Sequence, residues 1–166
     1  MNSLTDKYTL INSVEVPCIA FGTWKMPEEI AANAVKCAIE SGYRHIDTAA
    51  AYQNEEYVGK GIRESGVKRE EIFLVSKLPN DDHGYQNAID SCERSLKRLK
   101  TDYLDSYLIH WPVLVENVDR LEDDLCETWK AFEKLYNDGK LRSIGTSNFL
   151  EEHIEIIKRN FSTYPM

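Results

Sequence analysis

Residues 42–55 read Gly42-Tyr-Arg-His-Ile-Asp47-Thr-Ala-Ala-Ala-Tyr52-Gln-Asn-Glu55 and carry more structural information than any other part of this 166-residue chain. The run from Tyr43 to Ile46 is strand-like, with a carboxylate directly after it and a phenol five residues further on. Gly42 suits the left-handed cap that ends many helices. The stretch therefore predicts the end of a helix, a short strand, and a turn that carries Asp47 and Tyr52.

Two later strand-like runs also end in side chains that can take part in chemistry. Phe73-Leu-Val-Ser leads into Lys77, and Tyr103-Leu-Asp-Ser-Tyr-Leu-Ile109 leads into His110. In a parallel α/β barrel the carboxyl ends of the strands converge on one face, where active sites are built. We therefore expect the carboxylate, the phenol, the ammonium and the imidazole to meet at one end of a sheet.

The strand–helix unit recurs along the chain. Strands are expected near residues 19, 44, 73, 104 and 142, and they alternate with amphipathic helices, the second over about 54–64 and the last over about 151–159. This alternation predicts βαβ units and a parallel sheet. A hairpin over Tyr8–Pro17, turning at Asn12-Ser13, is expected before the first strand, which we place at Cys18–Phe21. We expect one α/β domain over residues 1–166.

Apolar residues at helical spacing predict which helix faces are buried. The faces consist of Ile30, Ala34, Cys37, Ala38 and Ser41 in the first helix, Ala88, Cys92, Leu96 and Leu99 in the third, and Leu121, Leu125, Trp129, Phe132 and Leu135 in the fourth. Three of the four cysteines, Cys37, Cys92 and also Cys126, are expected on the apolar faces of predicted helices. Since disulfides are rare in reducing compartments, we expect buried, unpaired thiols and a cytoplasmic location.

Composition excludes several classes of function. The formal net charge of −8 argues against general electrostatic binding of nucleic acid. No apolar run approaches the ~20 residues that span a bilayer, and Met1–Leu10 lacks a signal-peptide core. No cluster of His, Cys and carboxylate residues has metal-ligand spacing, so we expect no metal site. The other three histidines are not expected to take part in chemistry: His45 is expected to be structural, and His83 and His153 to be solvated.

The ordered set Asp47, Tyr52, Lys77 and His110 resembles the catalytic tetrad of the aldo-keto reductases. Two further stretches carry the resemblance. Asp102-Tyr-Leu-Asp-Ser-Tyr-Leu-Ile-His-Trp-Pro112 is similar to a signature of that family, and Ile144-Gly-Thr-Ser-Asn-Phe149 is similar to its fifth strand end. The resemblance implies an incomplete (β/α)8 TIM-type barrel, in which a hairpin cap over 1–17 precedes about five βα units over 18–160.

The resemblance also implies a role for each member of the tetrad. Tyr52 would give a proton to the carbonyl oxygen, and Lys77 would assist because a nearby ammonium favours the phenolate. Asp47 would hold the ammonium, and His110 would orient the carbonyl group. Each residue also has a purely structural interpretation: a helix or loop cap for Asp47, a loop aromatic for Tyr52, a partnered lysine for Lys77 and a hydrogen-bonded core histidine for His110. All four structural interpretations would have to be correct at once to replace the catalytic one.

A nicotinamide cofactor is implied because no side chain supplies hydride. By resemblance its nicotinamide end contacts Gly22, Thr23, Trp24, Asp47, Ser147 and Asn148. The substrate would lie against Trp24, Tyr52, His110 and Trp111. Family elements from strands six to eight, which grip the rest of NADPH, have no match in the chain, so weak NADPH binding is expected.

The predicted function is NADPH-dependent reduction of small aldehydes and ketones to alcohols. An inactive fragment, or a half-barrel that assembles with a copy of itself or with a complementing chain, is an alternative. A Schiff-base lyase that uses Lys77 is a second alternative, since desolvated lysines form Schiff bases. Five parallel strands leave two open edges and an apolar inward face, and such edges are templates for association. A homo-oligomer or a complementing partner is therefore expected.

Overall fold

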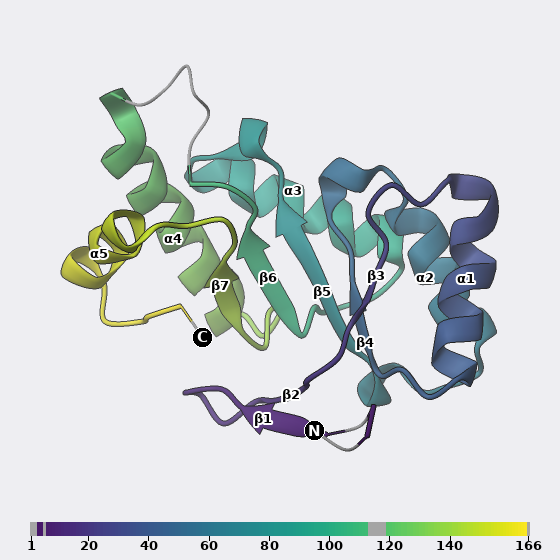
Figure 1. Cartoon of the computed structure of the whole chain (residues 1–166). Helices are drawn as coiled ribbons and strands as arrows, with labels where there is room; N and C mark the ends of the chain where they lie inside the picture. The colour runs from purple at the N-terminus through teal and green to yellow at the C-terminus, as the bar shows by residue number, and fades with distance from the viewer. Residues whose placement is uncertain (1–2, 5, 113–118, 166) are drawn as a thin grey trace.

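The computed structural model describes residues 3–4, 6–112 and 119–165, so residues 1, 2 and 5 of the predicted cap lie outside the described residues. Five parallel strands form one sheet in the order β3-β4-β5-β6-β7 (Figure 1). They are β3 (Phe21–Gly22), β4 (His45–Asp47), β5 (Phe73–Leu78), β6 (Ser106–Ile109) and β7 (Ile144–Thr146). Each strand pairs with the next one along the chain, which confirms the predicted parallel α/β arrangement.

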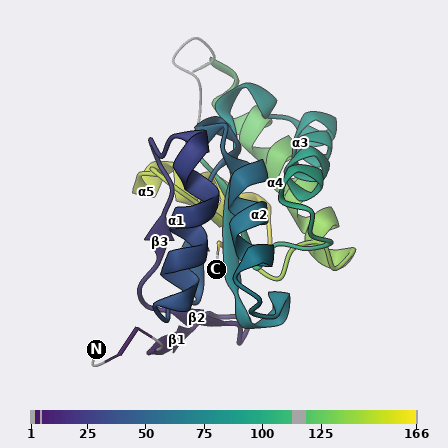
Figure 2. The same cartoon turned by 90° about the vertical axis from the view of Figure 1, so that its right-hand side faces the viewer.

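A helix follows each strand, as predicted. The helices are α1 (Glu28–Glu40), α2 (Glu55–Glu64), α3 (Tyr85–Leu99), α4 (Leu121–Asn137) and α5 (Glu151–Asn160). The first four lie on one side of the sheet, and α5 lies beside α4 (Figures 1 and 2). Among the helices that the structure describes, none combines the length and the apolar character needed to cross a membrane.

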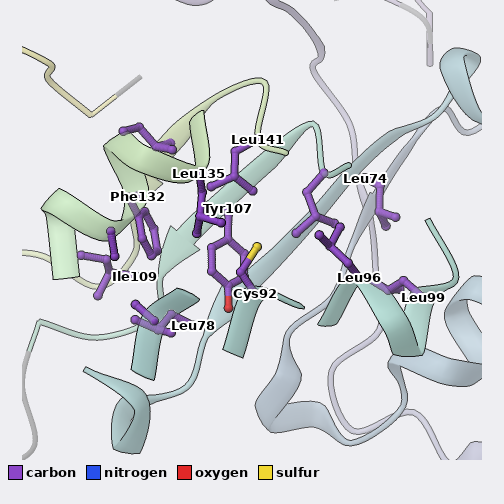
Figure 3. Packing of buried hydrophobic residues seen from close by; sticks show 14 of the residues in the cluster. Leu74, Leu78, Cys92, Leu96, Leu99, Tyr107, Ile109, Phe132, Leu135 and Leu141 are labelled. Carbon is purple, nitrogen blue, oxygen red and sulfur yellow. The ribbon is translucent and has the colours of Figure 1, made fainter. Parts of the chain in front are cut away.

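The main core lies between the helices and the sheet. Tyr107 of β6 packs on Phe132 of α4, with ring centroids 5.1 Å apart, and Leu74 and Leu78 of β5 belong to the same cluster (Figure 3). The buried faces predicted for α3 and α4 are confirmed, except that Leu121 is only half-buried. Burying this much apolar surface is the main stabilising contribution to such a domain.

The predicted face of α1 is largely wrong. The buried residues are Ala31, Ala32, Val35, Ala38 and Ile39, and Ile30 is 54% exposed. The reason is a close approach of α1 to α2, where a Cβ on Gly61 would lie 2.9 Å from Val35 Cβ. A helix that packs on its neighbour as well as on the sheet buries a face that apolar spacing alone does not identify.

The prediction for the cysteines holds only in part. All four are free, but Cys18 and Cys37 are exposed and Cys126 is half-buried. Cys37 is exposed because α1 presents a different face from the one predicted. Cys92 is buried in the core, and burial raises the pKa of its thiol to about 12. This thiol is therefore unreactive at neutral pH.

The hairpin is confirmed as β1 (Lys7–Thr9) and β2 (Glu15–Pro17). The first barrel strand starts later than predicted, at Phe21, because Cys18 still bonds to the hairpin segment through its N–H and the Asp6 carbonyl, 2.8 Å apart. The hairpin lies across the lower end of the sheet in Figure 1, and Asn12 Nδ2 donates to the Arg142 carbonyl at 2.9 Å.

The hairpin changes what the inward face of the sheet exposes. Phe73 and Val75 of β5 are only 6% and 4% exposed because Val16 of β2 packs against them. The expectation that apolar inward residues are exposed is therefore wrong for these two. The edges remain open: within the described residues, β3 and β7 each pair with one strand only.

A charged cluster joins the starts of several units at the hairpin end. Asp105 is 1% exposed and accepts from Arg69 at 2.8 Å, from Arg142 at 2.7 Å and from the Leu74 N–H at 3.0 Å. Arg69 also donates to the carbonyls of Ile72 and Tyr103. Asp105 thus ties the turn before β5 to the segments before β6 and β7.

We predict that Asp105→Ala lowers the free energy of unfolding by about 3 kcal/mol, because it leaves two arginines and a buried N–H without their acceptor. Urea unfolding measures the change. Asp102→Ala removes an exposed carboxylate three residues away and is expected to change stability by no more than about 0.5 kcal/mol. Equal stabilities for the two variants would contradict the proposed role of the cluster.

Candidate active site

The carboxyl ends of the strands bring the predicted tetrad together. Gly22 of β3 pairs with Asp47 of β4, and Lys77 of β5 pairs with Leu108 of β6. His110 directly follows β6. Because parallel strands end at the same edge of a sheet, side chains from sequence positions far apart meet there.

Lys77 lies at the centre of the group. It is 6% exposed, and its Nζ lies 2.7 Å from Asp47 Oδ1 and 2.9 Å from the Thr48 carbonyl oxygen. The same nitrogen lies 3.5 Å from the Tyr52 hydroxyl and 5.2 Å from the centroid of its ring. A buried ammonium needs such partners because its desolvation costs several kcal/mol.

His110 completes the group from β6. Its ring lies edge-on to the Tyr52 ring, with centroids 5.7 Å apart and an interplanar angle of 76°. Burial lowers the pKa of His110 below its ordinary value of 6.5, the Lys77 ammonium lowers it further, and Asp47 opposes both effects. The imidazole is therefore largely neutral at pH 7 and keeps one N–H that can donate a hydrogen bond.

Two supporting networks around the tetrad were not identified from the sequence. Thr23, Thr48 and Asn54 form a buried hydrogen-bonded group beside Asp47. On the helix side of β5, buried Glu55 accepts from Ser76 at 2.6 Å and from Arg98 at 2.7 Å. At the start of α2 an asparagine is ordinarily the helix cap and a glutamate ordinarily favours the helix dipole, so the sequence carried no clear signal of the roles of Asn54 and Glu55.

The predicted cofactor segments lie at the same edge of the sheet. Gly22 is exposed, and a Cβ built there would meet nothing within 4 Å. Ser147 is half-buried directly after β7, and exposed Asn148 donates to the His110 carbonyl at 2.8 Å. Thr23 differs from the expectation: it is fully buried, and its hydroxyl bonds to Thr48 at 2.9 Å instead of facing the open side.

The two tryptophans predicted to contact substrate are exposed, Trp24 by 67% and Trp111 by 48%. A cavity of about 530 Å³ adjoins His110 and Trp111 and is lined on its other sides by the turn at Ala50–Gln53, the Pro79–Asp82 segment and α3. Of the tetrad only His110 lines this cavity, which is also lined by Ser91, Arg94 and Arg98 of α3.

The remaining histidines are less solvated than predicted. His83 is half-buried, and its Nε2 lies 3.1 Å from the Trp111 carbonyl oxygen, so it supports the segment that carries Trp111. His153 is also half-buried and accepts from the Leu150 N–H at 3.0 Å. His45 has the structural role expected of it, with Nδ1 2.9 Å from the Pro17 carbonyl oxygen.

Comparison with known proteins identifies the group to which this geometry belongs. A model of the Aldo/keto reductase family matches residues 18–165. The chain belongs to the aldo-keto reductase family. It is 50% identical to a glyoxal reductase of Bacillus subtilis, with 99% of the chain aligned, and 46% identical to a 9,11-endoperoxide prostaglandin H2 reductase of Trypanosoma cruzi, with 100% aligned.

Solved aldo-keto reductases contain the same arrangement as part of a longer chain. The Brucella melitensis enzyme superposes with a TM-score of 0.89 at 42% identity over 97% of the chain and 60% of that structure. The Bombyx mori enzyme in complex with NADP superposes with a TM-score of 0.87 at 38% identity over 98% of the chain and 57% of that structure. The chain covers 57% of the Bacillus relative and 56% of the Trypanosoma relative.

The lowered pKa values of three partly buried histidines predict that the folded chain loses stability in mild acid. Burial lowers the pKa of His45, His83 and His110 below 6.5 in the folded chain. As the pH falls, the unfolded chain therefore binds protons first, and the free energy of unfolding decreases. We expect urea midpoints to fall steadily from pH 7.5 to pH 5.5. A constant or rising midpoint over this interval would contradict the assignment.

Proposed function

We propose that the chain carries the carbonyl-reducing centre of an oxidoreductase that uses NADPH to convert small aldehydes or ketones to alcohols. The observation that carries the proposal is the Lys77 ammonium held between Asp47 and the Tyr52 hydroxyl, with neutral His110 against the same ring. A phenol, an ammonium and an imidazole placed together suit proton delivery to a carbonyl oxygen better than they suit Schiff-base formation on Lys77.

The chain's own residues have separate tasks in this proposal. Tyr52 gives its hydroxyl proton to the substrate oxygen, and the adjacent ammonium favours the phenolate that remains. Asp47 and the Thr48 carbonyl hold Lys77 in place. His110 donates its one N–H to the same substrate oxygen. Such general acid catalysis contributes about 100- to 10,000-fold.

The residues around the strand ends fit a nicotinamide. Gly22 leaves open space at the end of β3, and the Ser147 hydroxyl and the Asn148 amide offer a donor and an acceptor for a carboxamide group. When bound, NADPH supplies the hydride that no side chain can supply. The contacts proposed here involve only the nicotinamide end, so we expect weak binding by this 166-residue chain.

The substrate class follows from the surroundings of the tetrad. Trp24 and Trp111 are exposed aromatic side chains on the segments that follow β3 and β6, and His110 and Trp111 also border a cavity lined mostly by polar residues. We therefore propose small carbonyl compounds as the substrate class. One relative is named a glyoxal reductase, which supports the proposed class.

We predict that Tyr52→Phe reduces substrate-dependent NADPH oxidation by at least about 100-fold, because the ring stays and the proton donor goes. The assay follows NADPH absorbance at high cofactor concentration with small aldehydes as substrates. Tyr85→Phe removes an exposed phenol on α3 and is the matched control, with unchanged activity expected. Full activity in Tyr52→Phe would refute the proposed proton donor.

Two outcomes of the same assay correspond to the alternative functions. Borohydride trapping of a carbonyl substrate on Lys77, without NADPH oxidation, would favour the Schiff-base lyase. Absence of both reactions in the wild-type chain, with normal unfolding by urea, would favour the inactive fragment.

We also propose that the chain associates through the open edges of β3 and β7. A strand edge presents unpaired N–H and C=O groups, and these pair with another strand when one is available. A second copy can pair its β3 with the β7 edge of the first, and two such contacts close a two-fold assembly. The unpaired cysteines suit a reducing compartment, so we place the protein in the cytoplasm.

Light scattering at low micromolar concentration tests the association. We expect a mass above the 19.1 kDa of one chain. Ala20→Lys places a charge beside the β3 edge and is expected to lower the measured mass. Ala51→Lys, on an exposed turn away from both edges, is the control and is expected to leave it unchanged. A stable 19.1 kDa wild-type species would contradict the proposal.

A further inference from the structure

Asn54 stands at the start of α2 but does not cap that helix. An asparagine in this position ordinarily accepts a hydrogen bond from the second or third N–H of the helix, worth about 1 kcal/mol. Here the side chain makes no such bond. It is 1% exposed, and its Nδ2 donates instead to the Thr23 carbonyl at 2.9 Å and to the Met26 carbonyl at 3.2 Å.

These two carbonyls begin and end one turn. The Met26 N–H donates to the Thr23 carbonyl at 3.2 Å, so residues 23–26 close on themselves and present Trp24 outward. Within this turn Lys25 has a φ of 57°. A left-handed backbone costs about 1–2 kcal/mol for a residue other than glycine. The turn is therefore strained and needs support from outside, which the Asn54 amide supplies.

The loop on the other side of Asn54 has the same character. Residues 50–52 form the 3-10 turn η1 (Ala50–Tyr52), which presents Tyr52 toward Lys77, and Gln53 after it has a φ of 59°. Asn54 is the next residue, so its anchored side chain holds the end of this strained turn. Strained residues of this type persist where the surrounding structure holds them, and they gather at functional sites.

The Thr48 hydroxyl connects Asn54 to the ammonium. Thr48 Oγ1 lies 2.9 Å from Thr23 Oγ1 and 3.3 Å from Asn54 Oδ1, and the Thr48 carbonyl accepts from Lys77. Thr23 and Thr48 are both fully buried. One buried network thus contacts the turn that carries Trp24, the turn that carries Tyr52 and the backbone that holds Lys77.

We propose that Asn54 is a positioning residue that sets the placement of Trp24 relative to Tyr52, and that α2 gives up its side-chain cap for this purpose. The link to catalysis rests on the proposed reductase function, but the clamp itself does not. Asn54 touches neither substrate nor cofactor in this proposal. It acts as a hydrogen-bond donor to two carbonyls that belong to the opposite turn.

The variant Asn54→Asp separates this positioning role from ordinary helix capping. Aspartate is as good a helix cap as asparagine, but as a carboxylate it has no N–H to donate. The measurement is amide hydrogen exchange by NMR on the full chain without cofactor. Asn54→Asp and Asn54→Ala are both expected to increase exchange at Met26 and Gln53 at least tenfold relative to Leu104 and Arg142. Wild-type protection at Met26 in Asn54→Asp would overturn the proposal.

Ser143→Ala is the matched control. It removes another buried hydrogen bond, from Ser143 Oγ to the Asp105 carbonyl at 2.7 Å, at the opposite end of the sheet. Here exchange is expected to rise at Arg142 and not at Met26. If the Asn54 variants do not fold, Thr48→Val removes only the hydroxyl link and is expected to increase exchange at Gln53. Uniform loss of protection across the sheet in the Asn54 or Thr48 variants would show that Asn54 contributes only to the overall stability of the fold. That result would refute the positioning role.

Activity provides a separate arm of the test. If the wild-type chain reduces carbonyls, Asn54→Asp is expected to lower kcat about tenfold or more, since misplacing reacting groups by about 1 Å costs up to about 100-fold. Local loss of protection in a chain without reductase activity would refute the proposed function and keep the clamp. Reductase activity in the wild-type chain, together with unchanged amide protection in the Asn54 variants, would keep the proposed function and refute the clamp.

Discussion

The burial of one ammonium constrains how the carboxyl ends of β4 and β5 are arranged. Lys77 is 6% exposed at the end of a fully buried strand, where an unpartnered charge would cost several kcal/mol. Asp47 and the Thr48 carbonyl meet this requirement only if β4 lies beside β5 in its observed register. The pairing of β4 with β5 and the path of the turn after β4 bring Asp47, the Thr48 carbonyl and Tyr52 to this charge.

The residues that support the tetrad do not make the contacts usual for their positions in a helix. Asn54 leaves the end of α2 without a side-chain cap, and Glu55 is buried to bond Ser76 and Arg98 instead of lying in solvent at the first turn. Two loop residues, Lys25 and Gln53, hold left-handed backbones. Left-handed backbones are not confined to this end, since Ser13 in the hairpin and Lys100 after α3 also have positive φ values, 68° and 55°.

The opposite end of the sheet serves stability. There the hairpin covers Phe73 and Val75, and Asp105 links the segments that precede three strands. This division matches the general behaviour of parallel barrels, in which chemistry is built at the carboxyl ends and stability at the amino ends. The family membership and the superposition on solved barrels place both ends within the same architecture, of which this chain spans somewhat more than half.

The sequence alone determined the strand–helix alternation, the hairpin, the family and the convergence of Asp47, Tyr52, Lys77 and His110, because each of these depends on periodicity, local turn chemistry or motif spacing. Only the tertiary structure decided which face of α1 is buried, that Val16 covers the inward side of β5, and that the Asn54 amide reaches the Thr23–Met26 turn. These depend on close approach of segments 20 or more residues apart, such as Gly61 against Val35. Short-range pattern cannot specify such contacts, because they form only when segments distant in the sequence pack against one another.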